Sequence, residues 1–255
     1  MAVLSTHGLT VGYPGKEIIR DINLSLSAGV LSVLVGANGS GKSTLLRTLA
    51  GTQAPLAGTV EIDGCEIASL NRREHARSLA VVLTGRSGGG ALTVRECVEI
   101  GRHPHTGAFG HLGMEDREAI ESAIEAVGIA DKTDRYLGTL SDGERQKVMI
   151  ARALAQHAGI IILDEPTAFL DVAGRLDSLQ LLRKLADNGH NIVLSTHDIA
   201  PAIACADTIM VVDKEKRTLL IGEAREMKES GALDRAFAGK DIHFDITKGD
   251  YIANK

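Results

Sequence analysis

The sequence predicts an α/β fold, in which a mainly parallel sheet carries an antiparallel β part at its N-terminal end and an inserted α-helical subdomain. Apolar, strand-like runs alternate with helical segments along much of the chain, as they do in parallel sheets. A glycine-rich turn at residues 36–44 joins one of these runs to a helix. Between residues 93 and 155 the pattern is helical, so the helical subdomain interrupts the chain of the sheet.

Each predicted strand is a short apolar or alternating run. The first half of the chain supplies Val3–Tyr13, Ile18–Leu26, Val30–Val35, Thr59–Gly64 and Leu79–Leu83. The second half supplies Gly159–Leu163, Asn191–Ser195 and Thr208–Val212, with a helix over Leu176–Asn188. In the helical part, the apolar residues that recur at helical spacing are Ile120, Ala123, Ile124 and Val127.

The changes between strand-like and helical patterns along the chain predict that a single domain is divided into a core, a subdomain and an extension. We expect residues 1–84 and 156–235 to form the α/β core, and residues 85–155 to form the helical subdomain. Residues 236–255 are expected to be a C-terminal extension. The sequence leaves open whether this last stretch packs on the core or pairs with a second copy of the chain.

The composition of the chain argues against several classes of protein, among them nucleic-acid binders and membrane-spanning proteins. A net charge of −5 and a pI near 6.0 argue against nucleic acid as a partner, because nucleic-acid binders usually carry a basic face. No apolar run approaches the roughly 20 residues of a membrane span, and no export signal is visible. The cysteines Cys65, Cys97 and Cys205 lie far apart and are expected to be reduced thiols, as in a cytoplasmic protein.

The glycine-rich turn reads Gly-Ala-Asn-Gly-Ser-Gly-Lys-Ser-Thr, which fits the phosphate-binding loop G-x-x-x-x-G-K-[ST]. Glycines let the backbone wrap around an anion, and the helix N-terminus adds N–H donors. Lys42 is expected to reach the outer phosphates and Ser43 to ligate Mg²⁺. We therefore predict a nucleoside triphosphate site and a P-loop NTPase core. The expected contacts are Gly36, Asn38, Gly39, Ser40, Gly41, Lys42, Ser43 and Thr44.

Two acids follow the apolar run Ile160–Leu163. A buried strand would deliver Asp164 and Glu165 at its C-terminal end, where ligands of open α/β sheets bind. Asp164 is placed to hold Mg²⁺ through water, and Glu165 to orient or deprotonate the attacking water. The structural alternative is a strand that runs into an exposed acidic turn.

Polar residues at two further positions allow both a structural and a functional interpretation. His197 follows the apolar run Ile192–Leu194, where a neutral imidazole would reach the γ-phosphate, although a lone histidine is more often structural. Ser141 and Glu144 precede a long helix, Lys147–Gln156, with the spacing of a capping box. A capped helix N-terminus with a hydroxyl is also an anion site, so both interpretations remain open.

Together these residues resemble the ATP-binding subunit of an ABC transporter over about residues 2–235. The matching parts are the phosphate loop (Gly36–Thr44), the signature motif (Leu140–Glu144), the acidic strand (Ile160–Glu165), the D-loop (Ala168–Asp171), the switch histidine (His197) and the adenine-stacking aromatic (Tyr13).

The resemblance implies that two copies pair head to tail, so that ATP on one phosphate loop is covered by Ser141, Gly143 and Glu144 of the other copy. Glu165 then acts as base, and His197 holds the γ-phosphate. Asp171 couples the two sites. The resemblance also implies transmembrane permease subunits as partners, a substrate-binding protein beyond them, and a peripheral position on the cytoplasmic face of the cell membrane.

Two departures from the family pattern stand out. Thr84 occupies the position of a Gln that usually contacts Mg²⁺ or the attacking water, and its hydroxyl has a shorter reach. The signature motif has Asp142 for Gly and Glu144 for Gln, and we expect Asp142 to point away from the phosphates. We nevertheless predict a functional ATPase.

The segment Leu92–His105 resembles ATP-binding subunits of importers for ferric siderophores, haem or cobalamin. One alternative is a soluble ABC-type ATPase for assembly or repair, although the chain lacks the long insertions such proteins often carry. Another is a regulatory module that binds ATP without turnover, which a loss of hydrolysis in Glu165→Gln would exclude. The transported substrate is not readable, because specificity in such systems lies in other subunits.

Overall fold

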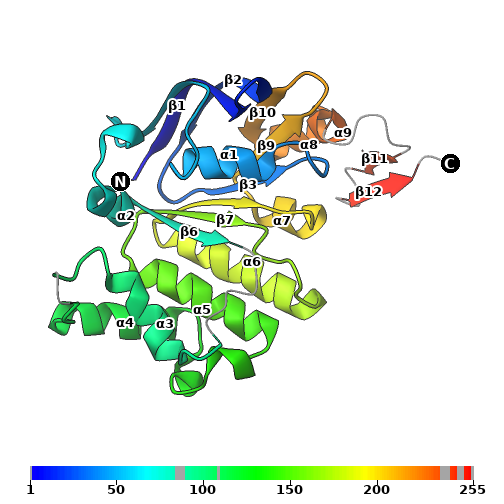
Figure 1. Ribbon diagram of the computed structural model, residues 1–255. Helices are drawn as coiled ribbons and strands as arrows, with labels where there is room; N and C mark the ends of the chain where they lie inside the picture. The colour runs from blue at the N-terminus through cyan, green and yellow to red at the C-terminus, as the bar shows by residue number, and fades with distance from the viewer. Residues whose placement is uncertain (1, 84–89, 108–109, 236–241, 246–249, 254–255) are drawn as a thin grey trace.

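The fold was obtained as a computed structural model, which describes residues 2–83, 90–107, 110–235, 242–245 and 250–253 (Figure 1). A central sheet separates two layers. Helix α1 (Lys42–Leu49) contacts β1, β7 and β8 on one side, whereas α6 (Val172–Asp187) contacts β3 and β8 and packs against α5. Figure 1 shows α3, α4 and α5 gathered at the end of the molecule away from α1.

The central sheet has the order β10-β9-β3-β8-β7-β6. In that order the strands are Thr218–Glu223, Thr208–Asp213, Leu31–Val35, Asn191–Ser195, Ile160–Asp164 and Leu79–Leu83. The strands from β9 to β6 pair in parallel, and β10 is antiparallel to β9. This arrangement confirms the predicted α/β fold with a mainly parallel sheet.

A second, antiparallel sheet has the order β2-β1-β4-β5. Its strands are Lys16–Leu26, Leu4–Tyr13, Ala57–Ile62 and Cys65–Glu66. Apolar residues of β1 and β2 share one core with α1, so this sheet covers the helix that follows the phosphate loop. A hairpin of β11 (Ile242–Asp245) and β12 (Asp250–Ala253) lies in the C-terminal extension, where it contacts α7 and α9.

The remaining helices connect these strands. They are α2 Arg72–Ser78, α3 Val94–Glu99, α4 Met114–Ala126, α5 Asp142–Ala155, α7 Ile199–Cys205, α8 Ala224–Glu229 and α9 Ala232–Arg235. Short 3₁₀ turns are Ile67–Ser69, Ile100–Arg102, Ala130–Lys132 and Leu137–Thr139. Across the part of the chain that the structure describes, no helix has the length and apolar character that crossing a membrane requires.

Helices α3, α4 and α5 fall within residues 85–155, the predicted helical subdomain. Their apolar faces do not form a separate core. Ile120 of α4 and Ile150 of α5 belong to the same buried cluster as Val33 and Ile161 of the sheet. The helices are therefore held directly on the sheet, and the division of the chain into subdomains stays a prediction.

Parallel pairing brings the carboxyl ends of β3, β7 and β8 to one edge of the sheet. Leu34 pairs with Ser195, and Ser195 pairs with Asp164. The phosphate loop leaves β3 at this edge, so the sheet itself gathers the polar residues that follow its strands.

Candidate active site

The phosphate loop ends at a helix N-terminus that has no side-chain cap. Gly41 is the N-cap residue of α1, and the first turn contains no acid. By contrast, Ser141 caps α5 and Asp171 caps α6 with their own side chains. The first N–H groups of a helix need partners, so those of α1 remain for a ligand.

Lys42 is buried at the start of α1, with only 6% of its surface exposed. Its Nζ donates to the carbonyl oxygens of Gly36 at 2.8 Å and Ala37 at 3.3 Å. Burial lowers the pKa of Lys42, while the carboxylates of Glu165 and Asp164 act in the opposite direction. The lysine thus closes the loop on itself, at the same end of the sheet as the two acids at the end of β7.

The loop has the features of a cradle for phosphate. Within the described part of the chain, the buried Ser40 Oγ has no hydrogen-bond partner. A Cβ on Gly36 would lie 2.9 Å from that oxygen, and a Cβ on Gly41 would lie 2.3 Å from Ile18 Cγ2. Asn38 and Gly39 are exposed at the loop tip. The orphaned hydroxyl, the side-chain-free backbone and the uncapped helix together fit a bound phosphate.

Ser195 holds the two acids at the end of β7. Its Oγ donates to Asp164 Oδ1 at 2.6 Å and accepts from the Glu165 N–H at 3.0 Å. The same N–H lies 3.1 Å from the Ser195 carbonyl oxygen. Asp164 and Ser195 are register partners on adjacent strands, which explains why the hydroxyl reaches both acids.

Glu165 has a left-handed backbone, with φ of 51°. For a residue with a side chain this conformation costs about 1–3 kcal/mol and often marks a functional site. Its Oε2 lies 3.4 Å from His197 Nδ1, and both side chains are partly exposed. The structure therefore brings Lys42, Asp164, Glu165 and His197 together at one edge of the sheet.

Tyr13 is at the end of β1, opposite Lys16, and 47% of its surface is exposed. The next residues of this hairpin reach the phosphate loop, because Ile18 contacts the position of Gly41. An exposed aromatic residue on the hairpin that reaches the loop fits the expected stacking of Tyr13 on a base.

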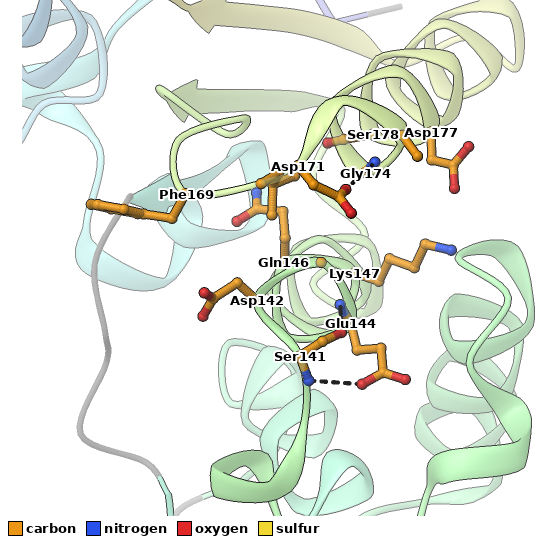
Figure 2. Close-up of a pocket in the computed structure, with 13 residues that line it drawn as sticks. Ser141, Asp142, Glu144, Gln146, Lys147, Phe169, Asp171, Gly174, Asp177 and Ser178 are labelled. Atoms are coloured by element: carbon orange, nitrogen blue, oxygen red, sulfur yellow. Dashed lines mark hydrogen bonds between the residues drawn. The ribbon is translucent and has the colours of Figure 1, made fainter.

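A second group of predicted residues lies in a different place. A cavity of about 490 Å³ is lined by the signature residues Ser141, Gly143 and Glu144 and by the D-loop residues Phe169 and Asp171 (Figure 2). Asp171 Oδ1 accepts the Gly174 N–H at 2.8 Å. Of the described residues, none from the phosphate loop lines this cavity. One chain thus holds two separate groups of predicted site residues.

The structure contains the capping box that the sequence left as one of two interpretations. Glu144 Oε2 accepts the Ser141 N–H at 2.8 Å, and Ser141 Oγ accepts the Glu144 N–H at 3.3 Å. These bonds, together with Lys132 Nζ at 3.0 Å, lower the pKa of Glu144 to about 2. Asp142 lies 3.9 Å from Arg145 Nη1. The role of this helix tip as an anion site stays a prediction.

The candidate protein ligands for Mg²⁺ are few, which is consistent with the small number of protein ligands that this ion needs. Among the described residues, no group of three or more His, Cys, Asp and Glu side chains is arranged around a metal position. Mg²⁺ is usually held by one or two protein oxygens together with substrate phosphates. Ser43, in the first turn of α1, and Asp164, at the end of β7, fit that pattern. Thr84 lies outside the described residues.

Sequence reasoning missed the residues that hold the predicted ones in place. Ser195 orients both acids, Lys132 pairs with Glu144, and Arg175 binds Asp198 next to His197. Ser195 and Asp198 lie on either side of Thr196 and His197, directly after the apolar run Ile192–Leu194, so their place at a strand end was a usable signal. Arg175 and Lys132 had none, because nothing in a single sequence reveals their partners.

Comparison with known proteins gives consistent matches. The family model described as ABC transporter matches residues 19–168. The iron(3+)-hydroxamate import ATP-binding protein of Bacillus subtilis is 37% identical, over 93% of this chain and 88% of that protein. The cobalamin import ATP-binding protein of Halobacterium salinarum is 41% identical, over 82% of this chain and 52% of that protein. A solved structure assigned to a metal-chelate type ABC transporter, facing inward, has a TM-score of 0.80 and 29% identity, over 93% of this chain and 89% of that chain.

Proposed function

This chain belongs to the ABC transporter family, and we propose that it is the ATP-hydrolysing subunit of an importer for a metal chelate, either a ferric siderophore or cobalamin. The observation that carries the proposal is the sheet edge where Lys42, Glu165 and His197 meet beside an uncapped helix N-terminus. The iron-hydroxamate and cobalamin import proteins among its relatives support the substrate class.

Each residue at the carboxyl ends of the strands has its own role in phosphoryl transfer. The α1 N-terminus and Lys42 bind the outer phosphates, and Tyr13 stacks on the base. Ser43 and Asp164 are the residues that would hold Mg²⁺, which when bound neutralises charge on the phosphate oxygens. Glu165 orients the attacking water and accepts its proton. His197, 3.4 Å from Glu165, donates a hydrogen bond to the γ-phosphate.

The second group of residues supports a head-to-tail dimer. Ser141 and Gly143 lie at the tip of α5. Apart from its chain neighbours and its own helix backbone, no heavy atom of the described residues stands within 4 Å of a Cβ built on Gly143, so this side of the tip can take a partner. In the dimer, this tip covers the nucleotide on the phosphate loop of the other copy. Permease subunits and a substrate-binding protein complete the importer, with this chain on the cytoplasmic face of the membrane.

The proposal is tested by steady-state ATP hydrolysis of the full-length chain. Glu165→Gln should keep ATP binding and lose turnover by a factor on the order of 100 or more, because it removes the base. Glu125→Gln, at an exposed position on α4, is the matched control and should keep turnover. Turnover in Glu165→Gln equal to wild type would refute the assignment. Hydrolysis by the wild type also tests whether Thr84 supports catalysis.

Transport is tested in cells that lack the gene. Uptake of radiolabelled ferric siderophore or cobalamin should be lost and restored by the wild-type gene, but not by Glu165→Gln. Unchanged uptake of both compounds would refute the substrate class while leaving the ATPase assignment intact.

A further inference from the structure

Buried hydrogen bonds tie the loop that carries His197 to the loop before α6. Thr167 Oγ1 lies 3.2 Å from Thr196 Oγ1, and both residues are almost fully buried. Thr167 Oγ1 also donates to Asp198 Oδ2 at 2.8 Å, while the Asp198 N–H donates to Thr196 Oγ1 at 2.9 Å. The residues on either side of His197 are therefore fixed, and the imidazole is left to face the site.

Arg175, in the first turns of α6, completes this connection. Its Nη1 donates to Asp198 Oδ1 at 2.7 Å, and its Nε donates to the Leu170 carbonyl oxygen at 2.8 Å. The Asp198 side chain is only 11% exposed and that of Arg175 is 37% exposed, so solvent reaches the pair mainly from the side of the arginine. One guanidinium thus joins the residue before Asp171 to the residue after His197.

The loop before α6 is itself a surface for a partner. Phe169 is 79% exposed, with a left-handed φ of 69°. Val172 and Leu176, on the first turns of α6, are also exposed apolar residues. In the cavity of Figure 2, this loop lies beside the tip of α5. A contact that shifts the loop would act directly on the Leu170 carbonyl that Arg175 holds.

We propose that Arg175 and Asp198 are a positioning pair that couples the D-loop to His197, so that docking of a second copy on the D-loop holds the imidazole in its place beside Glu165. This inference rests on the proposed function, in which two copies hydrolyse ATP together. The pair touches neither nucleotide nor water and acts only through His197. It makes turnover in each site depend on the presence of the partner.

The same helix offers a matched control. Arg183, two turns further along α6, binds Asp207 and the Cys205 carbonyl oxygen at the far end of α7. Both arginines therefore tie α6 to a residue that flanks α7, but Arg183 is remote from His197. If both arginines served only to hold the helices together, substitution of either one should have the same effect on Tm, kcat and the Hill coefficient.

The experiment compares Arg175→Gln and Arg183→Gln in the full-length chain. The readouts are the Kd for a fluorescent ATP analogue, kcat, the Hill coefficient for ATP and Tm. We expect Arg175→Gln to keep the Kd, to lower kcat about tenfold and to bring the Hill coefficient near one, because a charged hydrogen bond is lost. Arg183→Gln should lower Tm and leave kcat and the Hill coefficient unchanged.

Three further variants separate coupling from general damage. Asp198→Asn should reproduce the loss in kcat, and the double variant with Arg175→Gln should be no worse than either single one. Arg175→Lys keeps a positive charge beside Asp198, but a lysine lacks the planar group that bonds the Leu170 carbonyl oxygen and Asp198 at once. In this variant kcat should recover partly, while the Hill coefficient should stay near one.

Several outcomes overturn the inference: equal behaviour of Arg175→Gln and Arg183→Gln, losses in kcat that multiply in the double variant, or a wild-type Hill coefficient of one. Failure of the proposed function is recognised separately. In that case the wild type does not hydrolyse ATP, or Glu165→Gln hydrolyses it as fast.

Discussion

Gly41→Ala should destabilise the protein more than any neighbouring change in the phosphate loop. Gly41 has φ of 109°, and a Cβ there would lie 2.3 Å from Ile18 Cγ2. The backbone strain costs about 1–3 kcal/mol, and overpacking costs about 1–3 kcal/mol more. The expected loss in the free energy of unfolding is therefore about 2–6 kcal/mol.

Urea denaturation measures this loss, and titration with a fluorescent ATP analogue follows the site. The analogue should bind more weakly to Gly41→Ala, because relief of the overlap moves either the loop or β2. Gly39→Ala is the matched control in the same loop. Its φ is 69°, but among the described residues no heavy atom beyond its chain neighbours lies within 4 Å of the added Cβ, so only strain of about 1–2 kcal/mol is expected.

Ile18→Ala separates the two parts of the cost, because it removes the overlapping Cγ2. The nearest remaining atoms are Ile19 Cδ1 at 3.6 Å and Ile18 Cβ at 3.7 Å, which are ordinary contacts. In an Ile18→Ala background, Gly41→Ala should therefore cost only the backbone strain. An equal cost in both backgrounds, or a cost no larger than that of Gly39→Ala, would refute the reasoning.

Three other predictions concern side chains around the site and the core. Ser195→Ala should keep ATP binding and lower kcat about tenfold, since the acids lose a charged hydrogen bond; an unchanged kcat in steady-state assays would contradict this. Glu144→Gln should be less stable at pH 7 by about 1 kcal/mol. The pKa of Glu144 is lowered in the fold, so this difference should vanish as the pH falls from 4.5 toward 2 in thermal unfolding. Burial lowers the pKa of His190, so stability should fall as the pH drops below 6.5, and less steeply in His190→Gln; parallel curves of Tm against pH would disprove it.

The group of site residues at the carboxyl ends of the strands was predictable, because charged residues and the ends of apolar runs fall at the same positions of the sequence. Charged residues that directly follow apolar runs, such as Asp164 and Glu165, mark the carboxyl ends of parallel strands. Parallel pairing then brings His197 to the same edge without further information. The fold class followed from the same alternation of strands and helices.

Other features were hidden because they depend on register or on distant partners. Strand β10 is the outermost strand of its sheet and has partly buried residues that end in the exposed Glu223, so it lacks the alternation of buried and exposed residues that predicts a strand. Ser195 acquires its role from pairing with Asp164, and Arg175 from the packing of α6 near Asp198. A single sequence contains neither the register nor the packing. It does contain the strand ends, which is why the acids were found and their supports were not.

The tip of α5 shows how an acid is tolerated where this family usually has a neutral Gln. The Glu144 carboxylate is held by the Ser141 N–H and by Lys132 at 3.0 Å, so its charge is compensated within the chain. Because Ser141 Oγ accepts the Glu144 N–H, its own proton is free to be donated to an approaching phosphate. Within the described residues, the ion pair of Asp142 is a long contact of 3.9 Å with Arg145, and the Asp142 side chain is about half exposed. In the proposed dimer, Asp142 is therefore the acid of this tip whose charge is least compensated within the chain, so removal of that charge should strengthen ATP-dependent pairing, whereas removal of Lys132 should weaken it.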